Sequence, residues 1–226
     1  MKKIVGGLLV ILEGGEGVGK TTQAKALVEY YNSQGYSAKY FREPGGNPLA
    51  EQLRTMMLYN KMDTVTETLL INAARKINID NNILPALRDG DIVILDRFTK
   101  STLVYQGILN HGNLDFIDTC IEEVAKDLDG DGLSIEFTLL CDPEVAILRA
   151  AEEGHERNKY DTMTMDKYKE INDAYSKLYY NKNTKYRIFS PITSIIDTTE
   201  RSLGDVLERL IAGIDCVLKG CDIDDE

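Results

Sequence analysis

The stretch LEGGEGVGKTT, from Leu12 to Thr22, decides the fold of this chain of 226 residues. Gly14 to Thr21 fit the pattern GxxxxGK(S/T), in which glycines let several backbone N–H groups converge on one phosphate. The apolar run LLVIL (8–12) before the loop predicts a buried strand, and KTTQAKALVEYY (20–31) after it predicts a helix. This order of strand, loop and helix favours a nucleotide-phosphate site over a chance glycine-rich turn.

The loop also carries the side chains that such a site needs. Lys20 can reach the terminal phosphates, and the hydroxyl of Thr21 can ligate Mg²⁺. Asp96 ends a second apolar run, DIVILD (91–96), where a carboxylate can hold Mg²⁺ directly or through water, although an ordinary strand-ending turn is the alternative. We therefore predict a metal site at Thr21 and Asp96 and a nucleotide-binding set of Gly14, Gly15, Glu16, Gly17, Val18, Gly19, Lys20, Thr21 and Thr22.

Short apolar runs alternate with amphipathic stretches along the whole chain. The further runs are AKYF (38–41), IEFTLLC (135–141) and ITSIID (192–197). Near-continuous apolar strands separated by helices predict a parallel sheet covered on both faces, an α/β fold of three layers. The clearest helix has one apolar face, formed by Leu203, Val206, Leu207, Leu210, Ile211, Ile214, Val217 and Leu218.

Composition excludes several classes of protein. The formal net charge of -11 disfavours binding to nucleic acid polymers. Four cysteines without a CxxC pair and only two histidines make a zinc site improbable, and they favour a reducing, cytoplasmic setting. The start MKKIVGGLLVILEGG lacks a small-residue cleavage site, and no run of roughly 20 apolar residues predicts a membrane span. NKNT (181–184) is not the NKxD motif of a GTPase.

Three further stretches are more specific than the phosphate loop. FREPGGNPLAEQLR (41–54), AARKINIDNNILPAL (73–87) and DRFTKSTLVYQG (96–107) stand in the order and spacing found in thymidylate kinases. The chain resembles that family from about Leu8 to Thr199. The resemblance implies a P-loop fold with a five-stranded parallel sheet, a homodimer, and transfer of the ATP γ-phosphate to dTMP with Mg²⁺, a step toward dTTP. We expect one kinase domain over 1–226 with a lid at about 149–161.

The resemblance also assigns roles around the acceptor phosphate and sugar. Arg42 and Arg97 should grip the acceptor phosphate, since guanidinium presents a fork of donors to phosphate oxygens. Pro44 should shape the acceptor wall, Glu16 should face the sugar and the reacting phosphates, and Tyr105 should crowd the sugar 2′ position. The alternatives are surface salt bridges for the arginines, a plain turn at Pro44, a solvated loop glutamate and a packed tyrosine.

The base end follows the family with one departure. Arg75 matches an arginine that donates to the base O4, and Gln106 is expected near the acceptor. Ser101 and Thr102 match positions near the base, although helix capping explains hydroxyls at a helix start equally well. Ile71 replaces the usual aromatic that stacks on thymine, so dUMP or a 5-substituted deoxyuridylate stays open as acceptor.

The lid departs as well, because Glu152, Glu153 and Glu156 make it less basic than usual. Since the phosphate loop has no arginine, the lid must supply one, with Arg157 and Arg149 as candidates and Lys159 as support. The predicted catalytic set is therefore Lys20, Arg97, Arg157, Arg149 and Glu16. These departures keep a P-loop ATP-binding regulatory protein open as an alternative of another class.

Two segments are predicted with less detail. DLDGDGLSIEFT (127–138) imitates a calcium loop, but Thr138 replaces the bidentate glutamate and a strand follows, so we expect an acidic turn. IIDTT (195–199) matches the segment that borders adenine in the family.

Overall fold

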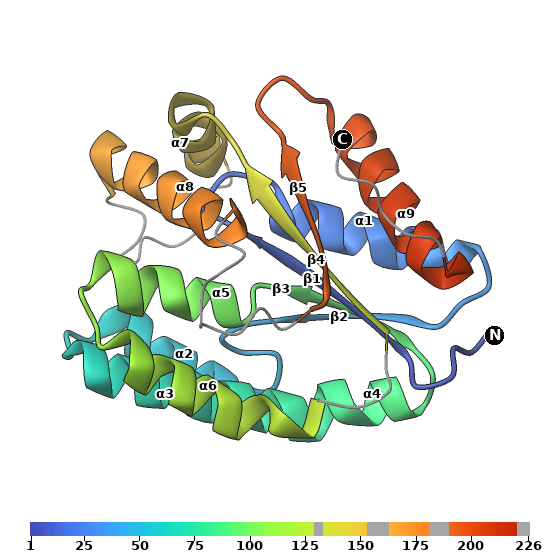
Figure 1. The fold of residues 1–226 in the computed structure, drawn as a ribbon, viewed down its shortest axis with the longest axis horizontal. Helices are drawn as coiled ribbons and strands as arrows, with labels where there is room; N and C mark the ends of the chain where they lie inside the picture. The colour runs from blue at the N-terminus through green and yellow to red at the C-terminus, as the bar shows by residue number, and fades with distance from the viewer. Residues whose placement is uncertain (129–132, 153–162, 181–189, 221–226) are drawn as a thin grey trace.

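The computed structural model describes residues 1–128, 133–152, 163–180 and 190–220. Within them a single sheet of five strands runs in the order β2-β3-β1-β4-β5, with every neighbouring pair parallel (Figure 1). The strands are β1 (Leu8–Gly14), β2 (Ala38–Arg42), β3 (Ile92–Asp96), β4 (Leu133–Leu140) and β5 (Ile192–Asp197). Both the α/β class and the five predicted strands are confirmed, with boundaries that differ by at most two residues.

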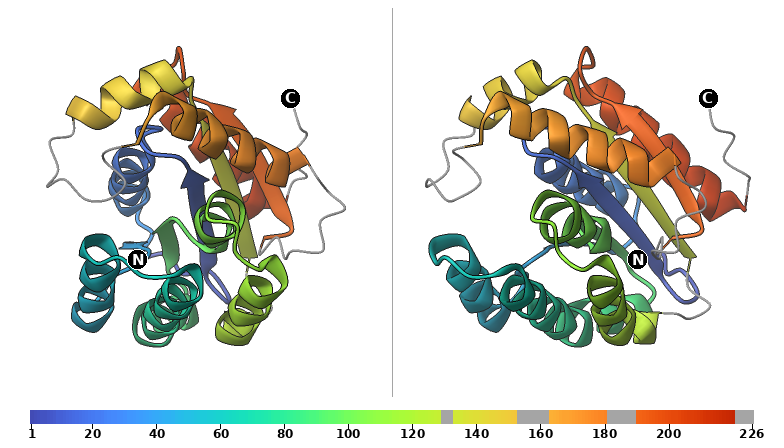
Figure 2. Two further views of the ribbon diagram at one scale, coloured as in Figure 1. Left: turned by 90° about the vertical axis from the view of Figure 1, so that its left-hand side faces the viewer. Right: turned by 60° about the vertical axis from the view of Figure 1, so that its left-hand side comes forward.

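Helices cover both faces of this sheet. Figure 1 shows α1 and α9 side by side on one face, and α8 contacts β4 and β1 from the other. In the two views of Figure 2, α3 lies between α2 and α6. The helices are α1 (Lys20–Ser33), α2 (Pro48–Tyr59), α3 (Thr64–Asn78), η1 (Ile79–Ile83), α4 (Leu84–Arg88), α5 (Thr99–Thr102), η2 (Leu103–Leu109), α6 (Leu114–Ala125), η3 (Lys126–Leu128), α7 (Pro143–Glu152), α8 (Met165–Tyr180) and α9 (Leu203–Lys219).

The central strand β1 shows why the sheet is covered on both sides. All seven of its residues are buried. Successive side chains of a strand point to opposite faces, so Val10 packs in the core that includes Leu210 of α9, while Ile11 packs with Ile79 and Ile83. A strand buried on both faces needs apolar residues at every position, which the sequence LLVIL provides.

Helix α9 confirms the predicted apolar face with one correction. Val206, Leu210 and Ile214 are buried, but Leu203 is 62% exposed. Leu203 is the first helical residue, directly after the N-cap Ser202, whose side chain accepts a hydrogen bond from the backbone N–H of Asp205. The first turn therefore projects beyond the sheet that the rest of the apolar face covers.

Strand register brings the functional segments to one edge. Leu12 of β1 and Arg42 of β2 both pair with Asp96 at the end of β3. The phosphate loop after β1, Arg42 and Arg97 therefore emerge side by side at the carboxyl edge, where open parallel sheets bind ligands. In the described part of the chain no helix is long and apolar enough to cross a membrane.

Candidate active site

The phosphate loop joins β1 to α1 in a conformation that requires glycine. Gly17 has φ 73° and Gly14 has φ 143°, in the range that L side chains rarely adopt. A Cβ on Gly17 would lie 2.0 Å from the carbonyl oxygen of Ala146 in α7, and one on Gly14 would lie 2.3 Å from that of Leu139. The loop is therefore confined between the end of β4 and α7, and neither Gly14 nor Gly17 can be replaced without moving the backbone.

Lys20 begins α1 and folds back over the loop. Its side chain is nearly buried, and Nζ donates a hydrogen bond to the carbonyl of Gly15. Burial and the positive charge of Arg97 lower the pKa of Lys20 to about 8, although Glu16 and Asp96 act in the opposite direction. The ammonium is therefore poorly solvated and is stabilised by any anion that enters the loop.

Thr21 and Asp96 lie together, as the predicted metal site requires. Oγ1 of Thr21 donates to Oδ2 of Asp96 at 2.5 Å, and the hydroxyl of Tyr40 lies 3.4 Å from the same oxygen. Both predicted ligands are oxygen donors, which suit Mg²⁺, an ion that takes few protein ligands and completes its shell with water and phosphate. The residues therefore fit this ion. In the described ranges no group of three or more His, Cys, Asp or Glu offers a metal an all-protein site.

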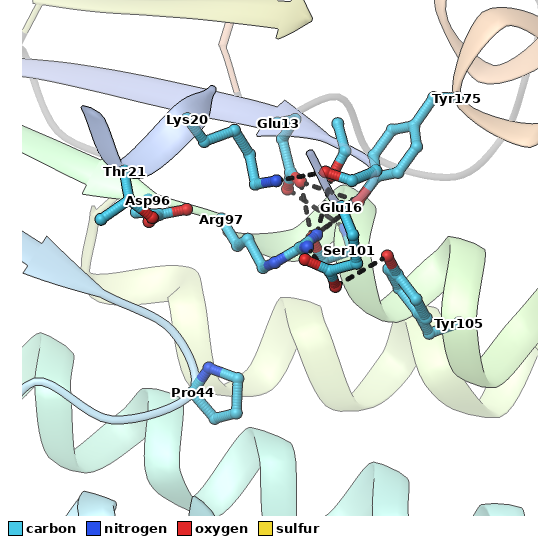
Figure 3. Close-up of polar contacts among 12 residues, drawn as sticks. Glu13, Glu16, Lys20, Thr21, Pro44, Asp96, Arg97, Ser101, Tyr105 and Tyr175 are labelled. Atoms are coloured by element: carbon cyan, nitrogen blue, oxygen red, sulfur yellow. Dashed lines mark hydrogen bonds and ion pairs between the residues drawn. The ribbon is translucent and has the colours of Figure 1, made fainter. Parts of the chain in front are cut away.

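Arg97 follows Asp96 and occupies the centre of the site (Figure 3). Its backbone has φ 71°, unusual for a residue with a side chain, and its N–H donates to the carbonyl of Leu12 at 2.9 Å. Nη1 donates to the carbonyl of Gly14 at 2.8 Å, and Nη2 forms an ion pair with Oε1 of Glu16 at 2.7 Å. This strained residue links the phosphate loop to the turn after β3, as expected of strain at functional sites.

Glu16 is held as a carboxylate by its neighbours. Burial alone would raise the pKa of Glu16, but the charges of Arg97 and Lys20 and hydrogen bonds from Arg97 and Tyr105 together lower it to about 2. The hydroxyl of Tyr105 donates to Oε1 of Glu16 at 3.3 Å, and the ring of Tyr105 lies under the guanidinium of Arg97, 5.3 Å from Cζ to the ring centroid. Glu16 is therefore paired with Arg97 and Tyr105 and is not the solvated loop glutamate that was the alternative.

Glu13 is a functional residue that the sequence did not reveal. It is fully buried at the end of β1 and accepts hydrogen bonds from the backbone N–H groups of Phe98 and Ser101 at 2.9 and 3.1 Å. The hydroxyls of Ser101 and Tyr175 also donate to it, at 2.7 and 3.3 Å (Figure 3). Glu13 thereby fixes the turn that carries Arg97. The one available signal was a carboxylate at the end of an otherwise apolar strand.

One cavity of about 840 Å³ extends from the phosphate loop to the predicted base end. Its lining includes Lys20, Thr21 and Asp96 as well as the acceptor candidates Arg42, Pro44, Ile71, Arg75, Arg97, Ser101, Thr102, Tyr105 and Gln106. The structure thus brings together every predicted acceptor residue in the volume range of a small-molecule site.

Arg75 is the most constrained of these residues. Only 1% of its surface is exposed, and Nε forms an ion pair with Oε2 of Glu43 at 2.7 Å. Nη2 donates to the carbonyl of Phe98 and to Oγ1 of Thr102, and Nη1 donates to Asn72. Four of its five N–H groups are used in this way, and no described residue accepts from the fifth, which lies on Nη1.

The hydroxyls of Ser101 and Thr102 do not cap helix α5. The N-cap of this helix is Phe98, and no side chain makes a capping hydrogen bond there. Ser101 instead donates to Glu13, and Thr102 accepts from Arg75. The capping alternative is therefore wrong for both residues.

Two arginines of the pocket wall differ in exposure. Arg42 is half-exposed and forms an ion pair with Glu51 of α2 at 3.0 Å, so the salt bridge considered as its alternative role is present. Arg54 of α2, which the sequence did not single out, is closer to the interior and donates to the carbonyl of Pro44 at 3.1 Å. Burial and the charge of Arg42 lower the pKa of Arg54, as expected where cations converge. Its position three residues after Glu51 on one helix face was the available signal.

Arg149 is the only lid candidate within the described residues. Its Nη2 donates to the carbonyls of Thr198 and Thr199, both at 3.1 Å, which ties α7 to the turn after β5. Thr198 also lies 3.4 Å from the carbonyl of Val18 in the phosphate loop, so the segment 195–199 reaches the loop. Arg157 and Lys159 lie outside the described residues, and the choice of catalytic arginine stays a prediction.

Two acidic segments are only partly described. Positions 129–132 of the calcium-like stretch and the tail 221–226 lie outside the described residues. Asp127 forms an ion pair with Lys76 at 2.9 Å, and Thr138 is buried within β4. The stretch therefore leads into a strand, where an EF-hand requires a helix.

A glycine loop with Lys20 and Thr21, followed by a helix and faced by a strand-ending carboxylate, defines a P-loop nucleotide-binding protein. The sequence model of the thymidylate kinase family matches residues 12–198. The chain therefore belongs to the thymidylate kinase family.

Its relatives extend over most of the chain. The thymidylate kinase of Bacillus pumilus is 32% identical over 210 residues, covering 90% of this chain and 98% of that protein. Those of Verminephrobacter eiseniae and Rickettsia africae are 37% and 34% identical, covering 75% and 79% of this chain and 77% and 86% of those proteins. Membership establishes the kind of enzyme, and the roles of individual residues stay predictions.

Proposed function

We propose that this protein transfers the γ-phosphoryl group of ATP to dTMP, giving ADP and dTDP. The observation that carries this proposal is the single cavity that runs from Lys20 and Asp96 to Ile71 and Arg75. Phosphoryl transfer needs the donor and acceptor phosphates end to end in one site from which water is excluded. A P-loop regulatory ATPase needs no second, nucleotide-sized compartment, so the cavity and the family both favour the kinase.

The reaction is a displacement at the γ-phosphorus. A phosphate oxygen of dTMP forms a new P–O bond as the bond to the β–γ bridging oxygen breaks, and ADP leaves with that oxygen's negative charge. Lys20 and the loop amides would stabilise the charge that builds up on the transferring group and on the leaving oxygen. Mg²⁺ at Thr21 and Asp96, when bound, supplies neutralisation of the β- and γ-phosphate oxygens.

The acceptor would be held by a group of cations. Arg97 lies nearest the phosphate loop, and Arg42 and Arg54 lie farther along the same cavity. Glu16 offsets their charge and, through its 2.7 Å ion pair, holds the guanidinium of Arg97 between loop and pocket. An arginine from the segment 149–161, Arg157 or Arg149, would complete the neutralisation of the transferring group.

The ring of Tyr105 is proposed to exclude a ribose. Its hydroxyl is fixed by Glu16 and its ring by Arg97, so the side chain cannot easily turn away from the sugar. A fixed aromatic ring at that place leaves too little room for a 2′-hydroxyl, which favours deoxyribonucleotides.

We also propose one kinase domain over 1–226 with a lid at 149–161, acting as a homodimer. The support for the dimer is an apolar patch on α2 and α3, where five large side chains are each at least half-exposed: Leu49, Met56, Tyr59, Val65 and Leu69. Light scattering after gel filtration tests it, since Leu49→Glu with Leu69→Glu should shift a dimer toward the monomer mass.

The experiment that tests the activity is acceptor-dependent ADP release with ATP, Mg²⁺ and a panel of dTMP, dUMP, dCMP, dAMP, dGMP and UMP. Strong turnover with dTMP and little with UMP is expected. A preference for dUMP would make Ile71 responsible for a base pocket of different shape. ADP release that does not depend on any acceptor would overturn the kinase and favour a regulatory ATPase.

A further inference from the structure

Glu67 is a buried carboxylate that the mechanism above does not use. It lies in the first turn of α3 with 6% of its surface exposed, although an exposed position would cost its charge far less. Its Oε2 accepts a hydrogen bond from Nε2 of Gln106 at 3.1 Å. Gln106 is also buried and belongs to the π-helical turn η2, a kind of turn that is frequent at functional sites.

This contact decides which way the amide of Gln106 points. A carboxylate only accepts hydrogen bonds, so the NH₂ group of Gln106 must face Glu67 and the carbonyl Oε1 must face the other way. Gln106 lines the cavity together with Ile71 and Thr102. Within the described ranges no group donates a hydrogen bond to Oε1 of Gln106. This oxygen is not one of the fully buried polar atoms without a partner, so it remains accessible to a ligand. A hydrogen-bond acceptor is therefore presented to the base end of the cavity.

Hydrogen-bond donors lie near this acceptor, on Thr102 and Arg75. Thr102 accepts from Arg75, so its own hydroxyl proton is available to donate, and one N–H of Arg75 is also unused by the described residues. An acceptor beside donors matches an imide base, which offers an N3–H between carbonyl oxygens. Cytosine offers an N3 acceptor and an exocyclic NH₂, which would set like against like at both places.

We propose that Glu67 is a positioning residue that fixes the amide carbonyl of Gln106 toward the N3–H of the base and so selects thymine or uracil over cytosine. The proposal rests on the proposed function, because it concerns the acceptor of that reaction. Without an obligate acceptor at position 67 the amide could turn by half a rotation and offer its NH₂ to cytosine N3. The base selectivity of Gln106 is thus set by Glu67, which contacts Gln106 but does not line the cavity.

The test compares kcat/KM for dTMP and for dCMP in the wild type and in Glu67→Gln. Because a neutral amide at position 67 accommodates both orientations of Gln106, the dTMP to dCMP ratio should fall by about tenfold or more. The KM for ATP should change by less than about twofold, since Glu67 is not among the residues that line the cavity. Glu67→Asp keeps an acceptor-only group and should retain the ratio. Glu122→Gln, exposed on α6, is the matched control.

A cycle with Gln106→Leu separates positioning from general damage. If Glu67 acts through Gln106, the double variant should have the same ratio as Gln106→Leu alone. The proposal would be overturned if the effects of Glu67→Gln and Gln106→Leu on the dTMP to dCMP ratio multiplied in the double variant. It would also be overturned if Glu67→Gln kept the wild-type ratio. Thermal unfolding of each variant shows whether the fold persists. If Glu67→Gln unfolds, Glu67→Asp carries the test. A folded Glu67→Asp that loses the wild-type ratio of kcat/KM for dTMP to dCMP would contradict the proposal. Wild-type protein without dTMP-dependent ADP release would instead sink the proposed function.

Discussion

The phosphate loop and the acceptor pocket lie at one edge of the same sheet but are built in opposite ways. The loop from Gly14 to Thr21 is continuous in sequence and presents backbone groups with three functional side chains, those of Glu16, Lys20 and Thr21. The acceptor pocket is assembled from β2, α2, α3, the turn after β3, α5 and η2, and its polar side chains are fixed by partners from other elements. One site depends on local conformation, whereas the other depends on long-range contacts between buried groups.

This difference predicts different responses to substitution. In the loop a change removes an interaction with ATP and leaves the fold intact. In the pocket wall a change leaves a second buried group without its partner, so stability falls together with activity.

The largest effect is expected for Lys20→Met. Methionine keeps the length of the side chain but removes the only positive charge of the loop, which can reach the transferring phosphoryl group, so kcat should fall by about 10³-fold. Acceptor-dependent ADP release measures it. The midpoint of urea unfolding should stay close to that of the wild type. A large loss of stability would show that the loop, like the pocket wall, depends on buried partners.

Arg97→Ala should separate the two regions. It removes the acceptor cation nearest the loop, so kcat/KM for dTMP should fall by about 10²–10³-fold while ATP affinity changes little. Titration of a fluorescent ATP analogue measures the second quantity. Arg97→Lys keeps the charge but loses the fork of donors, so its kcat/KM for dTMP should lie between those of the wild type and of Arg97→Ala. Equal losses of ATP binding and acceptor use would make Arg97 a structural residue of the loop.

Arg75→Met should act mainly on stability. It leaves the buried carboxylate of Glu43 without its ion-pair partner, which costs about 3–5 kcal/mol of unfolding free energy. Burial already raises the pKa of Glu43, although Arg75 opposes this shift. A neutral side chain at position 43 should therefore restore most of the unfolding free energy that Arg75→Met loses. Urea unfolding of Arg75→Met and of Arg75→Met with Glu43→Gln tests this. A double variant as unstable as the single one would contradict it.

The same contrast explains what could be predicted from the sequence. The strand LLVIL, the loop and the helix after it follow from local patterns, and the register of a parallel sheet then places Asp96 beside Thr21. The acceptor residues were found only because three motifs resemble a family, since nothing local distinguishes Arg75 from a surface arginine.

Their partners were missed for the same physical reason. Glu13 and Glu67 gain their roles from residues that are distant in sequence, at separations of 85 positions for Glu13 with Phe98 and 39 for Glu67 with Gln106. A buried carboxylate in sequence looks like any solvated one until the fold shows what donates to it.

Ile71→Phe should sharpen the description of the base pocket. An aromatic ring stacks on a base with about 1–3 kcal/mol, more than an isoleucine contributes, so the KM for dTMP should fall by about five- to tenfold with kcat nearly unchanged. Initial rates at saturating ATP measure both constants. Ile71→Leu, of equal volume without a ring, serves as the control and should leave KM within about twofold. A rise in KM for the phenylalanine variant would mean that the pocket is already filled at this position.

The smallest effect concerns the proton on Lys20. Its pKa of about 8 means that the ammonium is half deprotonated near pH 8, since burial and Arg97 disfavour its charge. The negative phosphates of ATP favour the charged form, so binding at pH 8 should take up about half a proton, and binding at about pH 6.5 should take up almost none from this group. Calorimetry in two buffers of different ionisation enthalpy measures the uptake. In Lys20→Arg the guanidinium is always charged and the uptake at pH 8 should vanish. Uptake that persists in Lys20→Arg would assign the proton to another group, and ATP binding in the loop would then be coupled to the titration of a residue other than Lys20.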